Sequence, residues 1–250
     1  MKTLSLISVL VVTTTALSAL VFSSFSSAAA ESPSLDTKAA DASPLIVAEL
    51  FTSQSCSSCP PAEALFSDLA ERDDLLTMEW HVDYWDQLVH GGSKWKDLYS
   101  SKAFTQRQRS YNRSLRGKSA VYTPQAIVNG KTEGVGNRRG KVTDLLEAAK
   151  MLSVPVTINN NVAEIGGSAS ATDILFVRLL KQHETDVKGG ENKGRKLAGK
   201  NIVLEANVIG QTGTGATSYK LPSIGENESC AVLVQSQKKN VGPIIGAAKC

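Results

Sequence analysis

The chain has 250 residues, of which 42% are hydrophobic and 20% are charged, and its formal net charge is +3. This composition is typical of a globular protein long enough for two modest domains, and it excludes a disordered or fibrous chain. Lysine and arginine are interspersed with aspartate and glutamate, so no large basic surface is expected and we predict no nucleic-acid partner.

The first thirty residues predict a secretory signal peptide. A lysine at position 2 precedes the uncharged stretch 4–22, and Ala28 and Ala30 fit a cleavage site of the A-x-A type. An uncleaved anchor is the alternative, and it is the only membrane association that we expect. The serine-, alanine- and aspartate-rich residues 31–43 predict a flexible leader. The sequence therefore predicts an exported protein, periplasmic or secreted, that folds from about residue 44.

Residues 44–152 predict an α/β domain with the order β-α-β-α-β-β-α. The apolar run 45–52 is typical of a strand buried on both faces in a parallel sheet. In the helix that follows Pro60 and Pro61, the apolar spacing leaves Glu63 on the solvent side. The later elements are expected at residues 75–85 (strand), 103–115 (helix), 125–128 and 132–135 (a hairpin turning at Asn129-Gly130), and 138–152 (helix).

Residues 153–250 predict a smaller, mainly antiparallel β domain packed on the first. Short β-type runs separated by glycine- and asparagine-rich turns support this prediction, at residues 154–158, 174–180, 202–209 and 231–234. The basic segment 189–196 predicts a mobile loop on the solvated surface.

The Cys56-Ser57-Ser58-Cys59 motif, between the first strand and the first helix, predicts a thiol–disulfide redox centre. A helix N-terminus favours a thiolate nearby, so Cys56 is the expected nucleophile and Cys59 the expected resolving cysteine. Because proline is tolerated only in the first turn of a helix, Pro60 and Pro61 place the helix start at Ser58 or Cys59 and leave Cys56 in the loop. A structural zinc site would need a second ligand pair at similar spacing, and the sequence has none.

Three segments together resemble an uncharacterised family of exported bacterial proteins with a thioredoxin-like fold, the domain of unknown function 1223. They are Val47–Pro61, His81–Asp86 and Val121–Gln125, and the resemblance extends over most of the mature chain. It implies a thioredoxin-like domain and a redox cysteine pair, and no settled activity.

The resemblance to thioredoxin-like folds also implies roles for three further residues. Pro124 takes the place of a cis-proline beside the two sulfurs, and the backbone of Thr123 takes the place that pairs with bound thiol substrates. X-Pro is the peptide bond at which cis is tolerated, although a trans turn proline is the alternative. Glu49 takes the place of a buried carboxylate that accepts the proton of Cys59, and a strand-end glutamate reaching solvent is the alternative.

The second cysteine pair, Cys230 and Cys250, predicts a structural disulfide near the C-terminus. Closing a loop of this length would stabilise the fold by about 3 kcal/mol on the chain-entropy estimate. An exposed free thiol at Cys250 is the alternative.

The leading functional hypothesis is a thiol–disulfide oxidoreductase without a cofactor, acting on exported proteins that carry thiols or disulfides or on small thiols. A copper-handling protein is the first alternative, with Cys56, Cys59 and a histidine such as His81 or His90 as ligands. A binding module that has lost turnover is the second. The sequence leaves open whether the centre works as oxidant, reductant or isomerase.

Overall fold

The computed structural model describes residues 45–90, 92–236 and 240–250. The predicted signal peptide and leader lie outside the described residues. None of the helices in the described ranges is long and apolar enough to cross a membrane.

The described chain is a mixed α/β protein in which a large sheet carries few helices. Along the chain the elements are β1 (Ile46–Thr52), α1 (Pro60–Leu69), β2 (Leu75–His81), α2 (Lys102–Arg116), β3 (Gln125–Val128), β4 (Thr132–Val135), α3 (Arg139–Glu147), β5 (Val156–Asn159), β6 (Val162–Ile165), β7 (Asp173–Asp186), β8 (Lys196–Gln211), β9 (Thr217–Lys220), β10 (Glu228–Gln235) and β11 (Ile244–Lys249). The predicted order β-α-β-α-β-β-α is confirmed up to α3, although β2 and α3 are shorter than expected.

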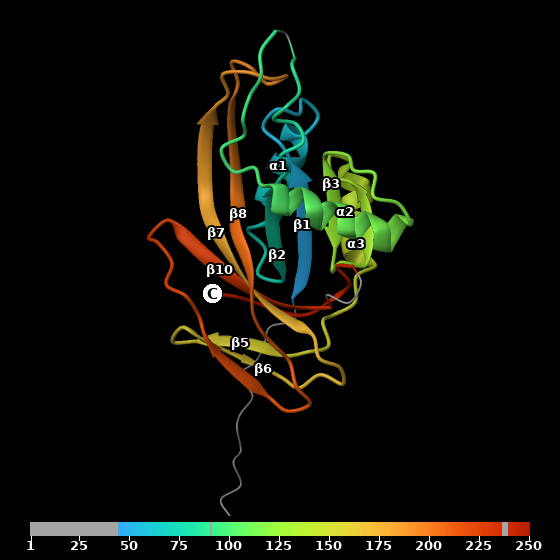
Figure 1. Cartoon of the computed structure of the whole chain (residues 1–250), viewed down its shortest axis with the longest axis vertical. Helices are drawn as coiled ribbons and strands as arrows, with labels where there is room; N and C mark the ends of the chain where they lie inside the picture. Colours follow the sequence, from blue (N-terminus) through green and yellow to red (C-terminus); the bar gives the residue numbers. More distant parts are fainter. Residues whose placement is uncertain (1–44, 91, 237–239) are drawn as a thin grey trace, which may run out of the picture. The chain divides into compact units, whose positions relative to one another are not determined.

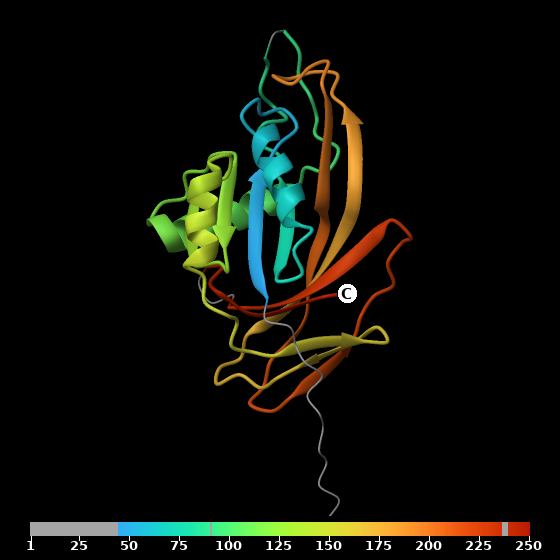
Figure 2. The same ribbon diagram turned by 180° about the vertical axis from the view of Figure 1, so that it is seen from behind.

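Eight strands form one mixed sheet in the order β11-β10-β7-β8-β2-β1-β3-β4 (Figure 1). β1 pairs with β2 in parallel and with β3 antiparallel, and all of its residues after Ile46 are buried, as its apolar run predicted. β2 meets β8 in parallel through a single residue pair, Glu79 and Ile202. The long antiparallel hairpin of β7 and β8 therefore continues the sheet that β1 to β4 begin (Figure 2).

This continuity differs from the expected separate β domain. Only β5, β6 and β9 form a small antiparallel sheet of their own, which shares an apolar core with β7 and β10. The expected boundary between residues 152 and 153 falls between α3 and β5, yet strands from both sides of it lie in the large sheet. Local sequence patterns predict where strands form. Contacts between residues that are distant in the sequence decide which strands pair.

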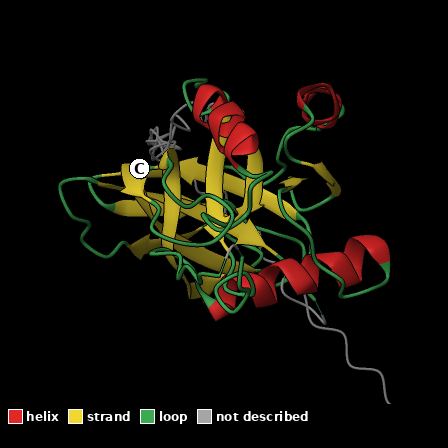
Figure 3. Cartoon of the chain, turned by 90° about the horizontal axis from the view of Figure 1, so that it is seen from above, coloured by secondary structure: helices red, strands yellow, loops and turns green. Residues whose placement is uncertain are grey.

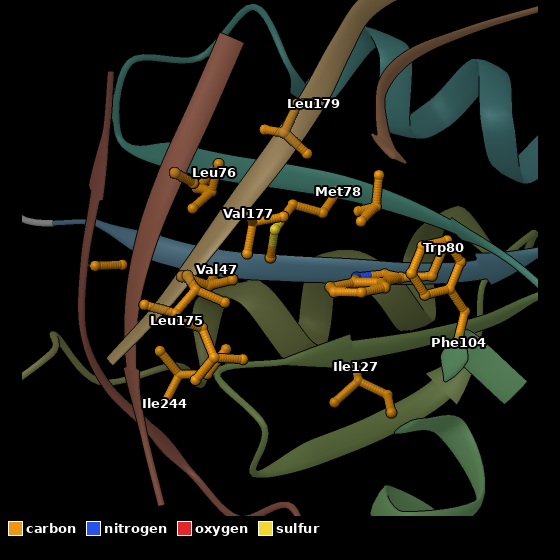
Figure 4. Packing of buried hydrophobic residues seen from close by; sticks show 14 of the residues in the cluster. Val47, Leu76, Met78, Trp80, Phe104, Ile127, Leu175, Val177, Leu179 and Ile244 are labelled. Carbon is orange, nitrogen blue, oxygen red and sulfur yellow. The ribbon is translucent and has the colours of Figure 1, made fainter. Parts of the chain in front are cut away.

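Helices cover both faces of the large sheet (Figure 3). α1 and α3 pack on one face against residues of β1 and β3, such as Leu50 and Ala126. On the other face, Trp80 of β2 packs between Phe51 of β1 and Phe104 of α2. Figure 4 shows the apolar cluster of that second face, to which β7 and β11 also contribute.

Short-range signals explain how several of these elements begin and end. The Ser101 side chain accepts a hydrogen bond from the Ala103 N–H at the start of α2, and Gly117 ends that helix with a positive φ of 68°. Asn129 and Gly130 both have positive φ between β3 and β4, which is the turn that their sequence predicts.

The predicted disulfide between Cys230 and Cys250 is present in the structure. It joins the start of β10 to the chain end just after β11, its antiparallel neighbour. The Cys250 N–H also donates a 2.9 Å hydrogen bond to the Cys230 carbonyl, so the bridge fastens the last strand to the sheet.

Candidate functional site

Cys56 and Cys59 form a disulfide between the end of β1 and the start of α1. The Cys56 N–H donates to the Ser53 carbonyl at 3.0 Å, and the Cys59 N–H donates to the Cys56 carbonyl at 3.2 Å, so the loop makes two successive turns. Cys59 is the N-cap of α1, which begins at Pro60 and not at Ser58 or Cys59 as expected, and Cys56 lies outside the helix as predicted. Both cysteines are buried, with Cys56 1% exposed.

Thr123 and Pro124 lie at the same end of the sheet as this disulfide. Their peptide bond is cis, as expected, and it directly precedes β3, whose first residue Gln125 is paired with Phe51 near the end of β1. The Trp85 indole N–H donates to the Thr123 hydroxyl at 2.8 Å. The segment that follows β4 connects the two loops, because the Gly136 N–H donates to the Pro124 carbonyl and the neighbouring Asn137 side chain donates to the Ser58 carbonyl.

The tip of the β7–β8 hairpin packs on the cysteine loop, where a solvated and mobile loop was expected. Asn192 is fully buried, and its amide nitrogen donates to the carbonyls of Gln54 and Cys56 at 3.0 and 2.9 Å. The Glu191 carboxylate accepts a 2.8 Å hydrogen bond from the Ser57 N–H. In Figures 1 and 2 this tip rises beside the loop that leads from β1 into α1. The basic composition of segment 189–196 does not reveal these hydrogen bonds, because the side chains of Glu191 and Asn192 make them.

The segment between β2 and α2 holds the cysteine loop from another side. The Asp97 carboxylate accepts a 2.7 Å hydrogen bond from the Gln54 N–H. The Trp95 indole N–H donates to the Gln54 side-chain oxygen, and the Trp95 carbonyl accepts from the Ser55 hydroxyl. The loop that carries the disulfide is therefore fixed by elements on both sides of it.

Glu49 does not lie with the cysteines, contrary to the expectation from the resemblance. Side chains alternate along a strand, and its neighbours Ala48 and Leu50 pack with α1, the helix whose N-cap is Cys59. Glu49 therefore points to the opposite face of the sheet, where it is fully buried. The alternative of a solvent-exposed glutamate is not found either.

The partner of Glu49 is Arg107 of α2. The guanidinium Nε lies 2.8 Å from a Glu49 carboxylate oxygen, and the Tyr111 hydroxyl donates to the other oxygen. Arg107 also donates to the Gln235 side chain and lies 4.6 Å from the centroid of the Trp80 ring. This is a buried ion pair with further hydrogen bonds from Tyr111 and Gln235, which has a structural part in the core.

Four ionisable side chains are buried on the face of the sheet that α1 covers. Glu63 of α1, which the helical pattern placed toward solvent, is 4% exposed and accepts a 2.6 Å hydrogen bond from the Thr52 hydroxyl. The imidazole Nδ1 of His81 lies 2.7 Å from the Asp97 carboxylate. Glu79 of β2 is the fourth, and neither of its oxygens has a hydrogen-bond partner among the described residues.

Burial and mutual charge divide these four groups into two pairs. Burial raises the pKa of the Glu63 carboxyl. Burial, followed by the negative charge of Glu63, raises the pKa of Glu79 well above its usual range. Burial alone would lower the pKa of His81, but the charge and hydrogen bond of Asp97 outweigh it and raise that pKa. The arrangement favours a charged His81–Asp97 pair, and it holds the pKa of both glutamate carboxyls above the usual value.

We expect the protein to lose stability as the pH rises, because of Glu79. Its folded-state pKa lies above its unfolded-state value, so the stabilisation is complete below the unfolded pKa and is lost as the pH rises toward the folded pKa. One such proton corresponds to a slope of about 1.4 kcal/mol per pH unit. Glu79→Gln removes the ionisation, so urea unfolding should give equal stabilities at pH 4 and a more stable variant at pH 8.

The matched control is Glu164→Gln, the same substitution at an exposed position of β6. It should follow the wild-type pH dependence. If Glu79→Gln also showed the wild-type pH dependence of stability, Glu79 would ionise as freely in the folded chain as in the unfolded one.

The alternative copper site is not assembled in the structure. His81 is engaged by Asp97 through Nδ1, and His90 lies 3.4 Å from a Glu191 oxygen. Within the residues that the structure describes, no group of three or more His, Cys, Asp or Glu side chains is placed to hold a metal ion. Cys56, Cys59 and His81 thus do not form a ligand set here.

Of the buried polar residues on this face and at the hairpin tip, the sequence singled out only His81. A signal existed for Glu63, because it follows Cys59 by four residues and so shares its helix face. Glu79 and His81 alternate with Met78 and Trp80 along β2, and this spacing indicated a shared face without saying which one. Asn192 and Glu191 carried no signal, since their partners are more than 130 positions away.

Two solved structures are similar to this chain. The Agrobacterium tumefaciens protein AGR_C_4864 is 31% identical, with a TM-score of 0.67 over 82% of this chain and 92% of that chain. HBP35 of Porphyromonas gingivalis is 13% identical, with a TM-score of 0.52 over 83% of this chain and 75% of that one, a likeness of fold alone.

No curated protein matches the sequence at a significant level. The family model described as "Protein of unknown function (DUF1223)" matches residues 47–235, which is most of the chain, and the protein therefore belongs to the DUF1223 family.

Proposed function

We propose that this protein is an exported thiol–disulfide oxidoreductase of thioredoxin-like type, with Cys56 as the attacking and Cys59 as the resolving cysteine. The observation that carries the proposal is the Cys56–Cys59 disulfide at the N-terminus of α1, where the positive end of the helix dipole favours a thiolate. Thr123 and Pro124 lie at the same end of the sheet and, by resemblance to thioredoxin-like folds, receive the substrate. Thiol- or disulfide-bearing exported proteins and small thiols are the proposed partners.

The proposed reaction is a reversible exchange of two electrons. The Cys56 thiolate attacks one sulfur of a substrate disulfide, which forms a mixed disulfide and releases the other substrate sulfur as a thiolate. The Cys59 thiolate then attacks the Cys56 sulfur, which re-forms the Cys56–Cys59 disulfide and releases the second substrate thiolate. The substrate disulfide is reduced to two thiols while the protein dithiol is oxidised, and the reverse sequence oxidises a substrate dithiol.

Glu63 is the proposed acceptor of the Cys59 proton, in place of Glu49. It follows Cys59 by four residues, a spacing that puts side chains on one helix face with Cβ atoms about 5–6 Å apart. Both side chains are buried, and burial raises the pKa of Glu63 toward the range in which a carboxylate can take and return a proton. The Thr52 hydroxyl donates to the carboxyl from the end of β1, and the charge of His81 lowers the pKa of Glu63 while that of Asp97 raises it.

Glu63→Gln should slow the step in which Cys59 attacks Cys56, because glutamine accepts no proton. A reduction of about 10²-fold is expected at neutral pH, the lower end of what a positioned base contributes. The rate of mixed-disulfide resolution should be measured by rapid alkylation and mass analysis from pH 6 to pH 9. The loss should shrink at high pH, where Cys59 ionises without help, and a loss that stays constant across this range would contradict the assignment.

The proposal is tested by turnover of a disulfide substrate. The protein and an excess of dithiothreitol should reduce a disulfide-bonded peptide faster than dithiothreitol alone. A variant with both Cys56→Ser and Cys59→Ser is the control, because it keeps the shape of the site and has no sulfur to exchange. Equal rates for the wild type and this control would contradict the proposal and favour a binding module that has no redox activity.

A further inference from the structure

We propose that Glu191, at the tip of the β7–β8 hairpin, is a positioning residue that makes the Cys56–Cys59 pair more reducing. This inference rests on the proposed function, and it gives the hairpin tip a part in the redox chemistry.

The hairpin tip is held against the cysteine loop by its backbone as well as by its side chains. The Glu191 N–H donates to the Ser55 carbonyl at 3.3 Å, and the next residue, Asn192, donates to the carbonyl of Cys56. Gly190 has a φ of 70° and lies so close to Ser55 that an added Cβ would meet its side-chain oxygen at 2.9 Å. These contacts fix the position of the Glu191 backbone, from which its side chain extends.

The carboxylate of Glu191 lies next to the attacking cysteine. One of its oxygens accepts the Ser57 N–H at 2.8 Å, and Ser57 is the residue directly after Cys56. Four covalent bonds join this nitrogen to the Cys56 sulfur, which keeps the two atoms within about 5 Å and the carboxylate within about 8 Å of the sulfur. The hydrogen bond also lowers the pKa of the Glu191 carboxyl, which therefore is ionised at neutral pH.

A negative charge at this position opposes the formation of a second one on Cys56. It disfavours the thiolate directly, and it occupies a backbone N–H that would otherwise be free to stabilise that thiolate. A less stable thiolate makes the reduced dithiol less stable relative to the disulfide, so the reduction potential is lowered. Glu191 thus shifts the pair away from a strong oxidant and toward a reductant.

Other charged groups also face this loop, and a Glu191 variant leaves them in place. His90 pairs with the second Glu191 oxygen, and Arg195 is held nearby through the Asn192 side chain. The Asp97 carboxylate accepts the Gln54 N–H of the loop, and the Glu63 carboxyl accepts the Thr52 hydroxyl at the end of β1. A Glu191→Gln variant therefore isolates one charge, since the glutamine side chain can still accept the Ser57 N–H.

The test is the equilibrium of the full-length protein with reduced and oxidised glutathione, combined with the pH dependence of thiolate absorbance at 240 nm. Glu191→Gln should lower the Cys56 thiol pKa by about one unit. The equilibrium constant should move about three- to tenfold toward the dithiol, which corresponds to a potential about 15–30 mV less negative for a two-electron couple.

Two control variants leave the carboxylate charge at position 191 in place. Glu191→Asp retains a carboxylate and should stay near the wild-type potential. Glu164→Gln removes the charge of an exposed side chain on β6 and should leave the potential unchanged. A wild-type protein that equilibrates with glutathione and a Glu191→Gln variant with the same potential and Cys56 pKa would overturn the inference alone. A wild-type disulfide that does not equilibrate would instead overturn the proposed function.

Discussion

Replacing Cys59 with serine is expected to abolish turnover while leaving the first chemical step intact. The Cys56 thiol can still attack a substrate disulfide, but no second sulfur is present to release the product. The mixed disulfide should therefore accumulate to about one per protein, and turnover should fall by about 10³-fold or more, as when a group that acts as part of a catalytic unit is removed. Mass analysis of the protein after incubation with a disulfide peptide measures both results.

Cys56→Ser is the matched variant for this experiment. It keeps Cys59 but removes the sulfur that is proposed to attack the substrate, so no stable adduct is expected. If Cys56→Ser captured the peptide and Cys59→Ser did not, the roles of the two cysteines would have to be exchanged.

Arg107→Met should have the largest effect on folding among single changes away from the disulfide. The Glu49 carboxylate is fully buried, and Arg107 is its cationic partner at 2.8 Å. Removing one member of a buried ion pair leaves an uncompensated charge, which typically costs about 3–5 kcal/mol. The free energy of unfolding in urea at pH 7 measures this loss, and a loss below about 1 kcal/mol would show that the pair contributes little.

The double variant Glu49→Gln with Arg107→Met separates the pair from the packing around it. Because neither charge remains, most of the stability lost in Arg107→Met should be recovered. Glu49→Gln alone should leave the rate of mixed-disulfide resolution unchanged, since Glu49 and α1 lie on opposite faces of the sheet. A slowed resolution in Glu49→Gln would restore Glu49 as the proton acceptor and contradict the assignment of Glu63.

Local signals in the sequence predicted the elements that position the cysteines. The apolar run of β1, the prolines at 60 and 61, and the Asn129-Gly130 turn each act over a few residues, and each is found where expected. Long-range pairing carried no comparable signal. β8 joins β2 through one residue pair and thereby unites two regions that the sequence presents as separate.

The site residues likewise fall into those that a local motif predicted and those that long-range packing places. Cys56, Cys59, Thr123 and Pro124 follow from motif and resemblance, and the structure brings their segments to one end of the sheet. The carboxylate was assigned to Glu49 by its strand alone, and the face of a strand is decided by which helix packs on it. Glu191 depends on a hairpin tip that returns to the cysteine loop from more than 130 residues away, which no local pattern encodes.

The proposed redox role of this protein requires that Cys56 and Cys59 be reversibly oxidised. The purified protein should be equilibrated with glutathione buffers of increasing reducing power, quenched with an alkylating reagent and analysed by mass. We expect a single two-electron transition in which Cys56 and Cys59 gain two alkyl groups together, while Cys230 and Cys250 remain joined. A Cys56–Cys59 disulfide that stays unmodified until Cys230–Cys250 is also reduced would contradict the redox role and leave a second structural bridge in its place.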